Sequence, residues 1–286
     1  MTLARTGDLV ADARAAGAAV GAFNVITLEH AEAVAAAAEA TGQPVILQVS
    51  ENAVAYHGGR LRPLAAACVE IAGTAGAKVS MHLDHVTSLD LLAEAASAGF
   101  ASVMYDAGAL AYADNLAATR QAVRIARADG LWIEAELGYV GGKPDAPRSA
   151  HAPGVRTDPD EAAAFCDETG VDALAVAVGS SHAMTTRTAV IDAALVARLA
   201  GSVPVPLVLH GSSGVPDDQL RAAMRAGIAK VNVGTALNVA MTGAVSAALA
   251  AEPELVDPRR YLASAREAMH TAVCQVLAVL SDQPPR

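Results

Sequence analysis

Short apolar runs rich in β-branched residues alternate along the chain with longer, alanine-rich segments whose apolar positions recur at helical spacing. Eight of the short runs are expected to form strands: Ala22–Ile26, Val45–Val49, Val79–Leu83, Ser102–Tyr105, Trp132–Leu137, Ala173–Val178, Leu207–Leu209 and Lys230–Val233. The intervening segments are expected to form helices: Leu28–Thr41, Leu61–Ala75, Leu89–Ala98, Asn115–Asp129, Asp160–Thr169, Asp192–Ala200 and Asp217–Ala226.

This alternation predicts a parallel sheet covered by helices, because continuous apolar strands are buried on both faces. Eight strand–helix units in 286 residues favour a closed (β/α)₈ TIM barrel over an open doubly wound sheet. No glycine-rich nucleotide-binding motif of the form GxGxxG opens a helix after a strand, which also weakens the open-sheet alternative. The sequence therefore predicts an α/β barrel with eight parallel strands.

We expect one domain over residues 1–286 with two additions to the barrel. Residues 236–286 are expected to form a C-terminal helical extension, interrupted at Glu252–Pro258. The segment of residues 138–156 contains three Pro and four Gly and shows no periodicity. A stretch of this kind is expected to be either a mobile active-site loop or a solvated excursion.

The composition excludes several classes of partner. The chain has 20 Lys and Arg against 30 Asp and Glu, and its formal net charge of −10 argues against binding to nucleic acid or anionic membranes. There is no apolar run of about 20 residues to span a bilayer, and no signal-peptide pattern. Cys68, Cys166 and Cys274 are far apart and are expected to be free thiols of a cytoplasmic protein rather than a disulfide or metal site.

Histidine and carboxylate residues gather at the ends of the expected strands. Asp84 and His85 end the third strand, His182 follows the sixth, and His210 follows the seventh. A lone histidine at a strand end is more often a surface residue, but the C-terminal ends of barrel strands meet at one face. Three neutral imidazoles that converge there, with a fourth position open, are a known arrangement for catalytic zinc.

Two neighbours of His85 need separate interpretation. Asp84 is expected either to orient a histidine ligand by hydrogen bonding or to act as the general acid/base beside a metal-bound substrate, and the second role is favoured. His82 is a weaker ligand candidate than His85, because side chains three apart on a strand point to opposite faces. We expect His82 to orient a neighbouring side chain.

Small and hydroxyl-bearing residues follow the last two strands. The segments are Gly211-Ser212-Ser213 and Asn232-Val233-Gly234-Thr235. Both would present backbone N–H groups at the starts of helices. This is the usual position of a phosphate site in barrels of this kind.

Taken together, these motifs resemble the class II fructose-bisphosphate aldolase family, which includes tagatose-bisphosphate aldolases. The resemblance runs from about Gly21 to Leu280. The motifs that carry it, in order, are Gly21-Ala22-Phe23-Asn24-Val25, His82-Leu83-Asp84-His85, Glu134-Ala135-Glu136-Leu137-Gly138, Leu209-His210-Gly211-Ser212-Ser213-Gly214 and Lys230-Val231-Asn232-Val233-Gly234-Thr235. The C-terminal segment around Asp257-Pro258-Arg259-Arg260-Tyr261-Leu262 is similar to the family's short-chain branch.

The resemblance implies a set of roles. His85, His182 and His210 would bind catalytic Zn²⁺, and Asp84 would take the C4 hydroxyl proton during cleavage. It also implies a second site for a divalent or monovalent cation at Asp106 and Glu136. The pocket for the donor phosphate would be formed by Ser50, Gly211, Ser212, Ser213, Asn232, Val233, Gly234 and Thr235, with Arg259 reaching the far phosphate. A homodimer or homotetramer is expected.

The activity implied is zinc-dependent, reversible retro-aldol cleavage of fructose 1,6-bisphosphate, or a close ketose phosphate, to dihydroxyacetone phosphate and an aldehyde such as glyceraldehyde 3-phosphate. Zinc would stabilise the enediolate charge without a Schiff-base lysine. The chain departs from the family pattern at Ala183, where Gly usually follows the middle zinc ligand, at Ala107, and at Pro144, where the family has Glu and Asp145 follows. The alternatives are an aldolase for tagatose bisphosphate or a modified sugar phosphate, and a non-catalytic subunit of an aldolase complex.

Overall fold

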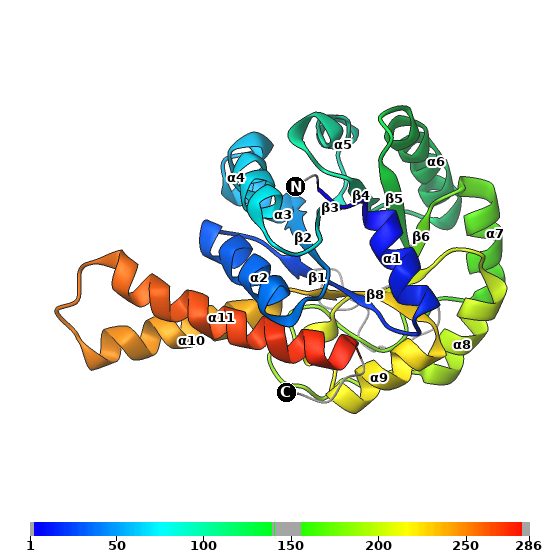
Figure 1. Ribbon diagram of the computed structural model, residues 1–286. Helices are drawn as coiled ribbons and strands as arrows, with labels where there is room; N and C mark the ends of the chain where they lie inside the picture. The colour runs from blue at the N-terminus through cyan, green and yellow to red at the C-terminus, as the bar shows by residue number, and fades with distance from the viewer. Residues whose placement is uncertain (1–2, 139, 141–155, 282–286) are drawn as a thin grey trace.

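The structure, a computed structural model, describes residues 3–138, 140 and 156–281. Eight parallel strands close into a barrel in their sequence order, with β1 hydrogen-bonded to β8 (Figure 1). The predicted TIM barrel is therefore confirmed. The strands are β1 (Val20–Asn24), β2 (Val45–Ser50), β3 (Val79–Val86), β4 (Ser102–Tyr105), β5 (Trp132–Leu137), β6 (Ala173–Val176), β7 (Leu207–Leu209) and β8 (Ile228–Val233).

Helices surround the barrel, with α1 before the first strand, α10 and α11 after the last, and the others between successive strands. They are α1 (Thr6–Ala15), α2 (Leu28–Thr41), α3 (Glu51–Tyr56), α4 (Leu61–Thr74), α5 (Leu89–Glu94), α6 (Tyr112–Ala128), α7 (Pro159–Thr169), α8 (Ala193–Ser202), α9 (Asp217–Ala226), α10 (Thr235–Ala251) and α11 (Pro258–Leu280), with short 3₁₀ turns at Ala96–Ala98 and Ser212–Gly214. The sequence pattern missed α1 and α3. The first buries only Thr6, Leu9 and Val10, and the second has six residues, so neither shows enough helical periodicity.

The main core lies between the outer faces of the strands and the helices. A separate, smaller core closes the N-terminal end of the barrel, where Leu9 and Val10 of α1 contact Val20, Ile46 and Ala229. Buried polar side chains occupy the strands nearer their C-terminal ends. These side chains are Gln48, His82, Asp84, Glu134, Glu136, His210, Lys230 and Asn232. The charged groups of the barrel interior thus lie toward one end, and that end is the candidate site.

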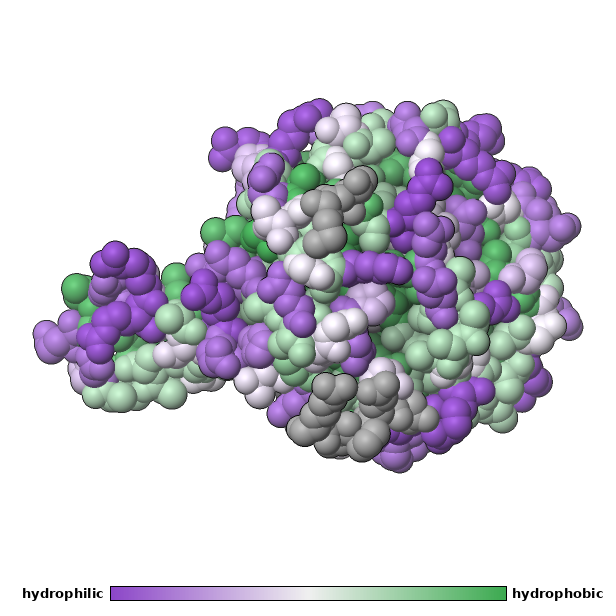
Figure 2. All heavy atoms as spheres, in the orientation of Figure 1, coloured by the Kyte–Doolittle hydropathy of each residue, from purple (hydrophilic) through white to green (hydrophobic). Residues whose placement is uncertain are grey.

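The last two helices form an arm that extends away from the barrel (Figure 1). α10 contains no charged residue, and its only buried residue is Leu237. α11 returns toward the barrel and becomes buried only from Ala265 onward. Figure 2 shows weakly hydrophobic surface along one side of the arm and hydrophilic surface along the other. No helix in the described part of the chain has the length and apolar character needed to cross a bilayer.

Candidate metal centre and active site

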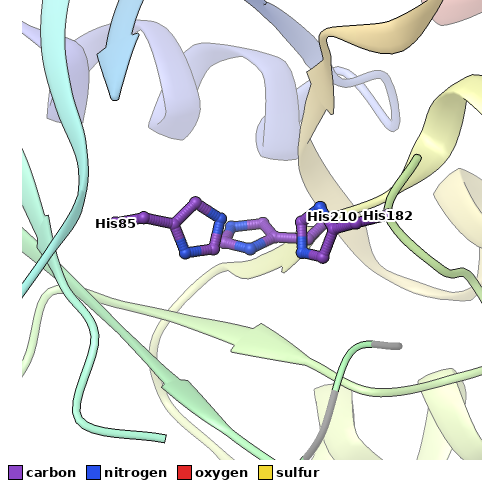
Figure 3. A group of neighbouring side chains, drawn as sticks. All are labelled: His85, His182 and His210. Atoms are coloured by element: carbon purple, nitrogen blue, oxygen red, sulfur yellow. The ribbon is translucent and has the colours of Figure 1, made fainter. Parts of the chain in front are cut away.

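Three histidines from three parts of the barrel point toward one another (Figure 3). His85 lies on β3, His182 follows β6 and His210 follows β7. One ring nitrogen from each falls within 4.8 Å of the others, and the ring centroids are 4.9 to 5.9 Å apart. The structure thus brings together the three histidines that the sequence predicted as zinc ligands. Three imidazoles, with His210 buried and His85 and His182 partly exposed, form a donor set suited to zinc.

His85 reaches this cluster through an irregular backbone. Regular alternation along β3 sends His82 and Asp84 into the barrel, and it would send His85 outward. The register between β3 and β4 shifts between Leu83 and Val86, and His85 has a φ of 50°. This left-handed conformation is uncommon for a residue other than glycine and turns the imidazole back toward the centre.

Carboxylates hold the outer nitrogens of two of the rings. The Nδ1 atom of His85 lies 2.8 Å from Oδ2 of Asp106, and the Nε2 atom of His210 lies 2.8 Å from Oε1 of Glu134. Each contact fixes a ring orientation and leaves the opposite nitrogen to face the cluster. A carboxylate behind a histidine is a common support for a metal ligand, so the residues fit a bound zinc ion.

Asp106 and Glu136, the residues expected at a second cation site, flank the same glycine. A Cβ atom placed on Gly108 would lie 3.2 Å from Oδ1 of Asp106 and 3.6 Å from Oε1 of Glu136. Glu136 Oε2 also lies 3.1 Å from Nδ1 of His210. The two carboxylates therefore border the histidine cluster, and Asp106 in addition orients a histidine directly.

The charges of the site shift its pKa values. Burial on its own would lower the pKa of His210, but hydrogen bonds to Glu134 and Glu136 outweigh it and raise the pKa to about 10. Burial would raise the pKa of Glu134, but the ammonium of Lys230 lowers it to about 2. In the absence of metal, a proton therefore competes for the same nitrogen of His210 that faces the cluster.

Asp84 lies beside the histidines, on the side of the cluster rather than behind the rings as Asp106 and Glu134 do. Its Oδ2 accepts a hydrogen bond from Nε2 of Gln48 at 2.9 Å and lies 3.8 Å from Nε2 of His85. Its Oδ1 lies 3.7 Å from Nε2 of His82, whose Nδ1 contacts the Ser102 hydroxyl at 2.8 Å. Burial opposes ionisation of Asp84, but the neighbouring histidines outweigh it and lower its pKa below the ordinary carboxyl range.

A pocket of about 390 Å³ opens over the cluster, and Asp84, His85 and His182 are among its lining residues. Six of the residues expected to bind phosphate also line it: Ser50, Gly211, Ser213, Asn232, Gly234 and Thr235. Gly211 has a φ of 64°, and a Cβ atom there would approach the Ser181 carbonyl carbon to 2.5 Å, so the turn requires glycine.

Three other expected substrate residues lie elsewhere. The Ser212 hydroxyl donates a hydrogen bond to the backbone carbonyl of Asn232 below the pocket, and Val233 is part of the core. Arg259 lies at the start of α11, where it pairs with Asp257 and its side chain is 89% exposed. It does not line the pocket of its own chain. Pro144 and Asp145 lie outside the described residues, as does most of the segment 138–156.

Pattern reasoning did not assign roles to several residues that complete the site. Gln48, Glu134 and Lys230 are buried within β2, β5 and β8, and Asn24 accepts a hydrogen bond from Gln48 at 2.7 Å. A signal was present, because Glu134 and Lys230 alternate with apolar residues along β5 and β8, and Gln48 follows three apolar residues in β2. Buried polar groups need partners, and such positions therefore point to a network in the barrel interior.

Comparison with known proteins gives consistent results. Residues 4–283 match the family described as "Fructose-bisphosphate aldolase class-II". The chain is 37% identical to a fructose-bisphosphate aldolase of Thermus caldophilus, with 93% of this chain and 94% of that protein covered. It is 39% identical to a probable fructose-bisphosphate aldolase of Bacillus subtilis, with coverages of 96% and 95%. Among solved structures, the YdjI aldolase from Escherichia coli K12 matches with a TM-score of 0.81 at 29% identity, over 98% of this chain and 97% of that chain.

Proposed function

This chain belongs to the class II fructose-bisphosphate aldolase family, whose members are metal-dependent lyases, and from that premise we propose a zinc-dependent cleavage of fructose 1,6-bisphosphate or a close ketose phosphate. The products are dihydroxyacetone phosphate and an aldehyde such as glyceraldehyde 3-phosphate. The observation that carries the proposal is the placement of the buried carboxyl group of Asp84 beside the cluster of His85, His182 and His210 in one pocket.

The three histidines hold the metal in this proposal. Asp106 and Glu134 orient His85 and His210, so that the inner nitrogens of both rings remain aimed at the ion. Zinc bound there supplies a Lewis acid that polarises the ketose carbonyl. A second cation at Asp106 and Glu136 is also proposed, supported by the closeness of both carboxylates to Gly108.

Asp84 moves the proton of the reaction. Its carboxylate takes the proton from the C4 hydroxyl as the C3–C4 bond breaks, and the electron pair of that bond passes to the donor fragment. The new carbonyl leaves with the aldehyde product. A proton added to C3 of the donor fragment completes dihydroxyacetone phosphate, and Asp145 is the candidate for that step from the sequence alone.

The pocket residues after β7 and β8 hold the donor phosphate in this proposal. Gly211 and Ser213 follow β7, and Gly234 and Thr235 lie at the start of α10, where unpaired backbone N–H groups favour an anion. Ser50 lines the same pocket from the end of β2. The placement of two glycines here allows the phosphate to approach the backbone closely.

A lysine is not needed as a nucleophile. The chain has three lysines, Lys78, Lys143 and Lys230. Lys78 is near the opposite end of the barrel, beside the first residues of β1 and β3, and Lys143 lies outside the described residues. Lys230 is fully buried and directs its ammonium at three oxygen acceptors, so its nitrogen has no lone pair to attack a carbonyl.

We also propose a homodimer or homotetramer, a single domain and a cytoplasmic location. The support for a second copy comes from the arm: α10 is uncharged and almost wholly unburied, and Arg259 at the arm's far end is remote from its own pocket. A second copy that packs on α10 would cover an apolar surface and bring Arg259 to the far phosphate in the other chain's pocket.

Metal analysis together with a substrate panel tests the function. Zinc-loaded protein is incubated with fructose 1,6-bisphosphate, tagatose 1,6-bisphosphate and phosphorylated sugar acids, and dihydroxyacetone phosphate release is measured for each. Release that is fastest with fructose 1,6-bisphosphate supports the proposed substrate. Faster release from another sugar identifies the alternative aldolase, and no release from any of them by the zinc-loaded protein favours the non-catalytic subunit.

A further inference from the structure

Lys230 is a charged residue at the centre of the barrel, on β8, with no exposed surface. Its ammonium lies 2.8 Å from Oε2 of Glu134, 2.8 Å from Oδ1 of Asn232 and 3.5 Å from Oε1 of Gln48. An ammonium has three N–H donors, and here each has an acceptor. A buried cation is costly unless it is paired and hydrogen-bonded in this way, so the arrangement requires a reason.

Each of the three side chains that accept from Lys230 also has a polar atom directed at a different part of the site. Glu134 uses its other oxygen to hold Nε2 of His210 at 2.8 Å. Gln48 uses its amide nitrogen to donate to Oδ2 of Asp84 at 2.9 Å. The amide nitrogen of Asn232 is buried, has no hydrogen-bond partner among the described residues, and belongs to a residue that lines the pocket.

The ammonium determines how these three groups are oriented. An amide has an oxygen that accepts and a nitrogen that donates, so when the oxygens of Gln48 and Asn232 face Lys230, their nitrogens must face away from it. Those nitrogens then point at Asp84 and at the pocket. Glu134 lies between two donors, the imidazole of His210 and the ammonium, and only a carboxylate offers an acceptor to both.

We propose that Lys230 is a positioning residue that orients the metal ligand His210 through Glu134, the acid/base Asp84 through Gln48, and a substrate-binding N–H of Asn232 directly. The roles of His210 and Asp84 rest on the function proposed above. The contacts that carry the proposal are between this chain's own side chains, so it is testable by metal binding as well as by turnover. Lys230 does not line the pocket.

The main test is Lys230→Met, which keeps an unbranched side chain one atom shorter and removes the charge. We expect the zinc dissociation constant, measured by competition with a chromophoric chelator, to rise about 10–100-fold, the usual effect of removing support behind a ligand. We also expect the Co²⁺-substituted protein to show an altered visible absorption spectrum, because the ring of His210 is no longer held. At saturating zinc, kcat falls and KM rises, since Asp84 and Asn232 are affected separately from the metal.

Two further variants, Glu134→Gln and the double variant Lys230→Met/Glu134→Gln, separate a positioning role from general destabilisation of the fold. In Glu134→Gln, the side-chain amide has one oxygen to accept from two donors, His210 and Lys230. We expect the orientation of His210 to be lost in part, and zinc affinity to fall. In Lys230→Met/Glu134→Gln the ammonium is gone, the amide oxygen can accept from His210, and no buried charge is left unpaired. The double variant is therefore expected to fold and to bind zinc more tightly than Lys230→Met. Lys78→Met is the matched control, with the same change at an exposed position and no expected effect.

The outcomes decide the proposal. Wild-type zinc affinity, Co²⁺ spectrum and kcat in Lys230→Met would overturn it, whether or not the melting temperature falls. A double variant that binds zinc no better than Lys230→Met would overturn the path through Glu134. If the wild type cleaves no ketose phosphate, the function proposed above fails, while a weakened zinc affinity in Lys230→Met still supports Lys230 as a positioning residue.

Discussion

The interior of the barrel and the helical arm differ in where their ion pairs lie: the barrel contains a buried pair and the arm an exposed one. In the barrel, Lys230 and Glu134 are paired at 2.8 Å with neither side chain exposed. In the arm, Arg260 pairs with Glu252 at side-chain exposures of 57% and 53%. Water already solvates the arm's pair, so it adds little, whereas a buried charge that loses its partner costs several kcal/mol. Removal of one charged partner is therefore expected to destabilise the protein more in the barrel than in the arm.

The backbone shows the same contrast. In the described part of the chain, the non-glycine residues with positive φ are His85 at 50° and Ala183 at 58°, and both line the candidate pocket. The arm has none among its described residues. Strained conformations persist where surrounding contacts fix them, and they are concentrated at functional sites. Substitutions in the two regions test this contrast.

Alanine in place of His85, His182 or His210 should abolish both zinc binding and cleavage. Each replacement removes one of three ligands, and the remaining two imidazoles cannot retain the ion at a catalytic site. Zinc per chain after dialysis and release of dihydroxyacetone phosphate are the two measurements. His270→Ala, a histidine of α11 beside Glu267, is the control and should retain both. A variant that lacks one of the three and remains fully active after chelation would contradict the site.

Asp84→Asn should reduce kcat by about 10²–10⁴-fold while zinc stays bound. The amide has nearly the same shape but cannot accept the C4 hydroxyl proton. Zinc content and steady-state rates on the same preparation are the measurements. If zinc affinity collapses while the remaining loaded enzyme turns over at the normal rate, Asp84 only orients a ligand.

Arg259→Ala should lower kcat/KM for a ketose bisphosphate by about 10–100-fold, the value of a lost hydrogen bond between charged groups. Arg260→Ala, one residue along in the same helix, should leave it unchanged, because that side chain pairs with Glu252 on the surface. Equal effects of the two substitutions would rule out a specific phosphate contact.

Mixing experiments sharpen the prediction for Arg259. If Arg259 serves the partner's pocket, then Arg259→Ala and Asp84→Asn chains that are unfolded together and refolded should form mixed dimers with one intact site. Activity above that of either variant alone is expected. If the mixture shows mixed dimers by mass spectrometry but no gain in activity, Arg259 does not act across chains.

Ala183→Gly should raise the free energy of unfolding of the metal-free protein by about 1 kcal/mol, because Ala183 has a left-handed conformation that glycine adopts without strain. The same replacement at the exposed Ala247 in α10 should lower it by about 1 kcal/mol, because glycine weakens a helix interior. Urea unfolding curves measure both. Changes of the same sign would show that the backbone contrast between the site and the arm has no energetic consequence.

The order of strands and helices was predictable from sequence because the apolar period is a local property. Ser102–Tyr105, Trp132–Leu137 and Leu207–Leu209 form strands with the bounds that the pattern predicts. The C-terminal ends of barrel strands share one face. The sequence alone therefore places four residues at that face: Asp84, His85, His182 and His210. The expected tail was also confirmed as α10 and α11.

Which polar side chains meet inside the barrel required the tertiary structure. The alternation of polar and apolar residues in β3, β5 and β8 indicates which side chains of a strand share a face, but not which residues of other strands they contact. The contacts of Glu134 with His210 and Lys230 join residues 76 and 96 positions apart, and the inward turn of His85 depends on a register shift against β4. The local pattern of apolar residues is enough to specify the barrel and the end that carries the histidines. Which polar groups meet is set by the packing of the strands, because it depends on long-range register rather than on local period.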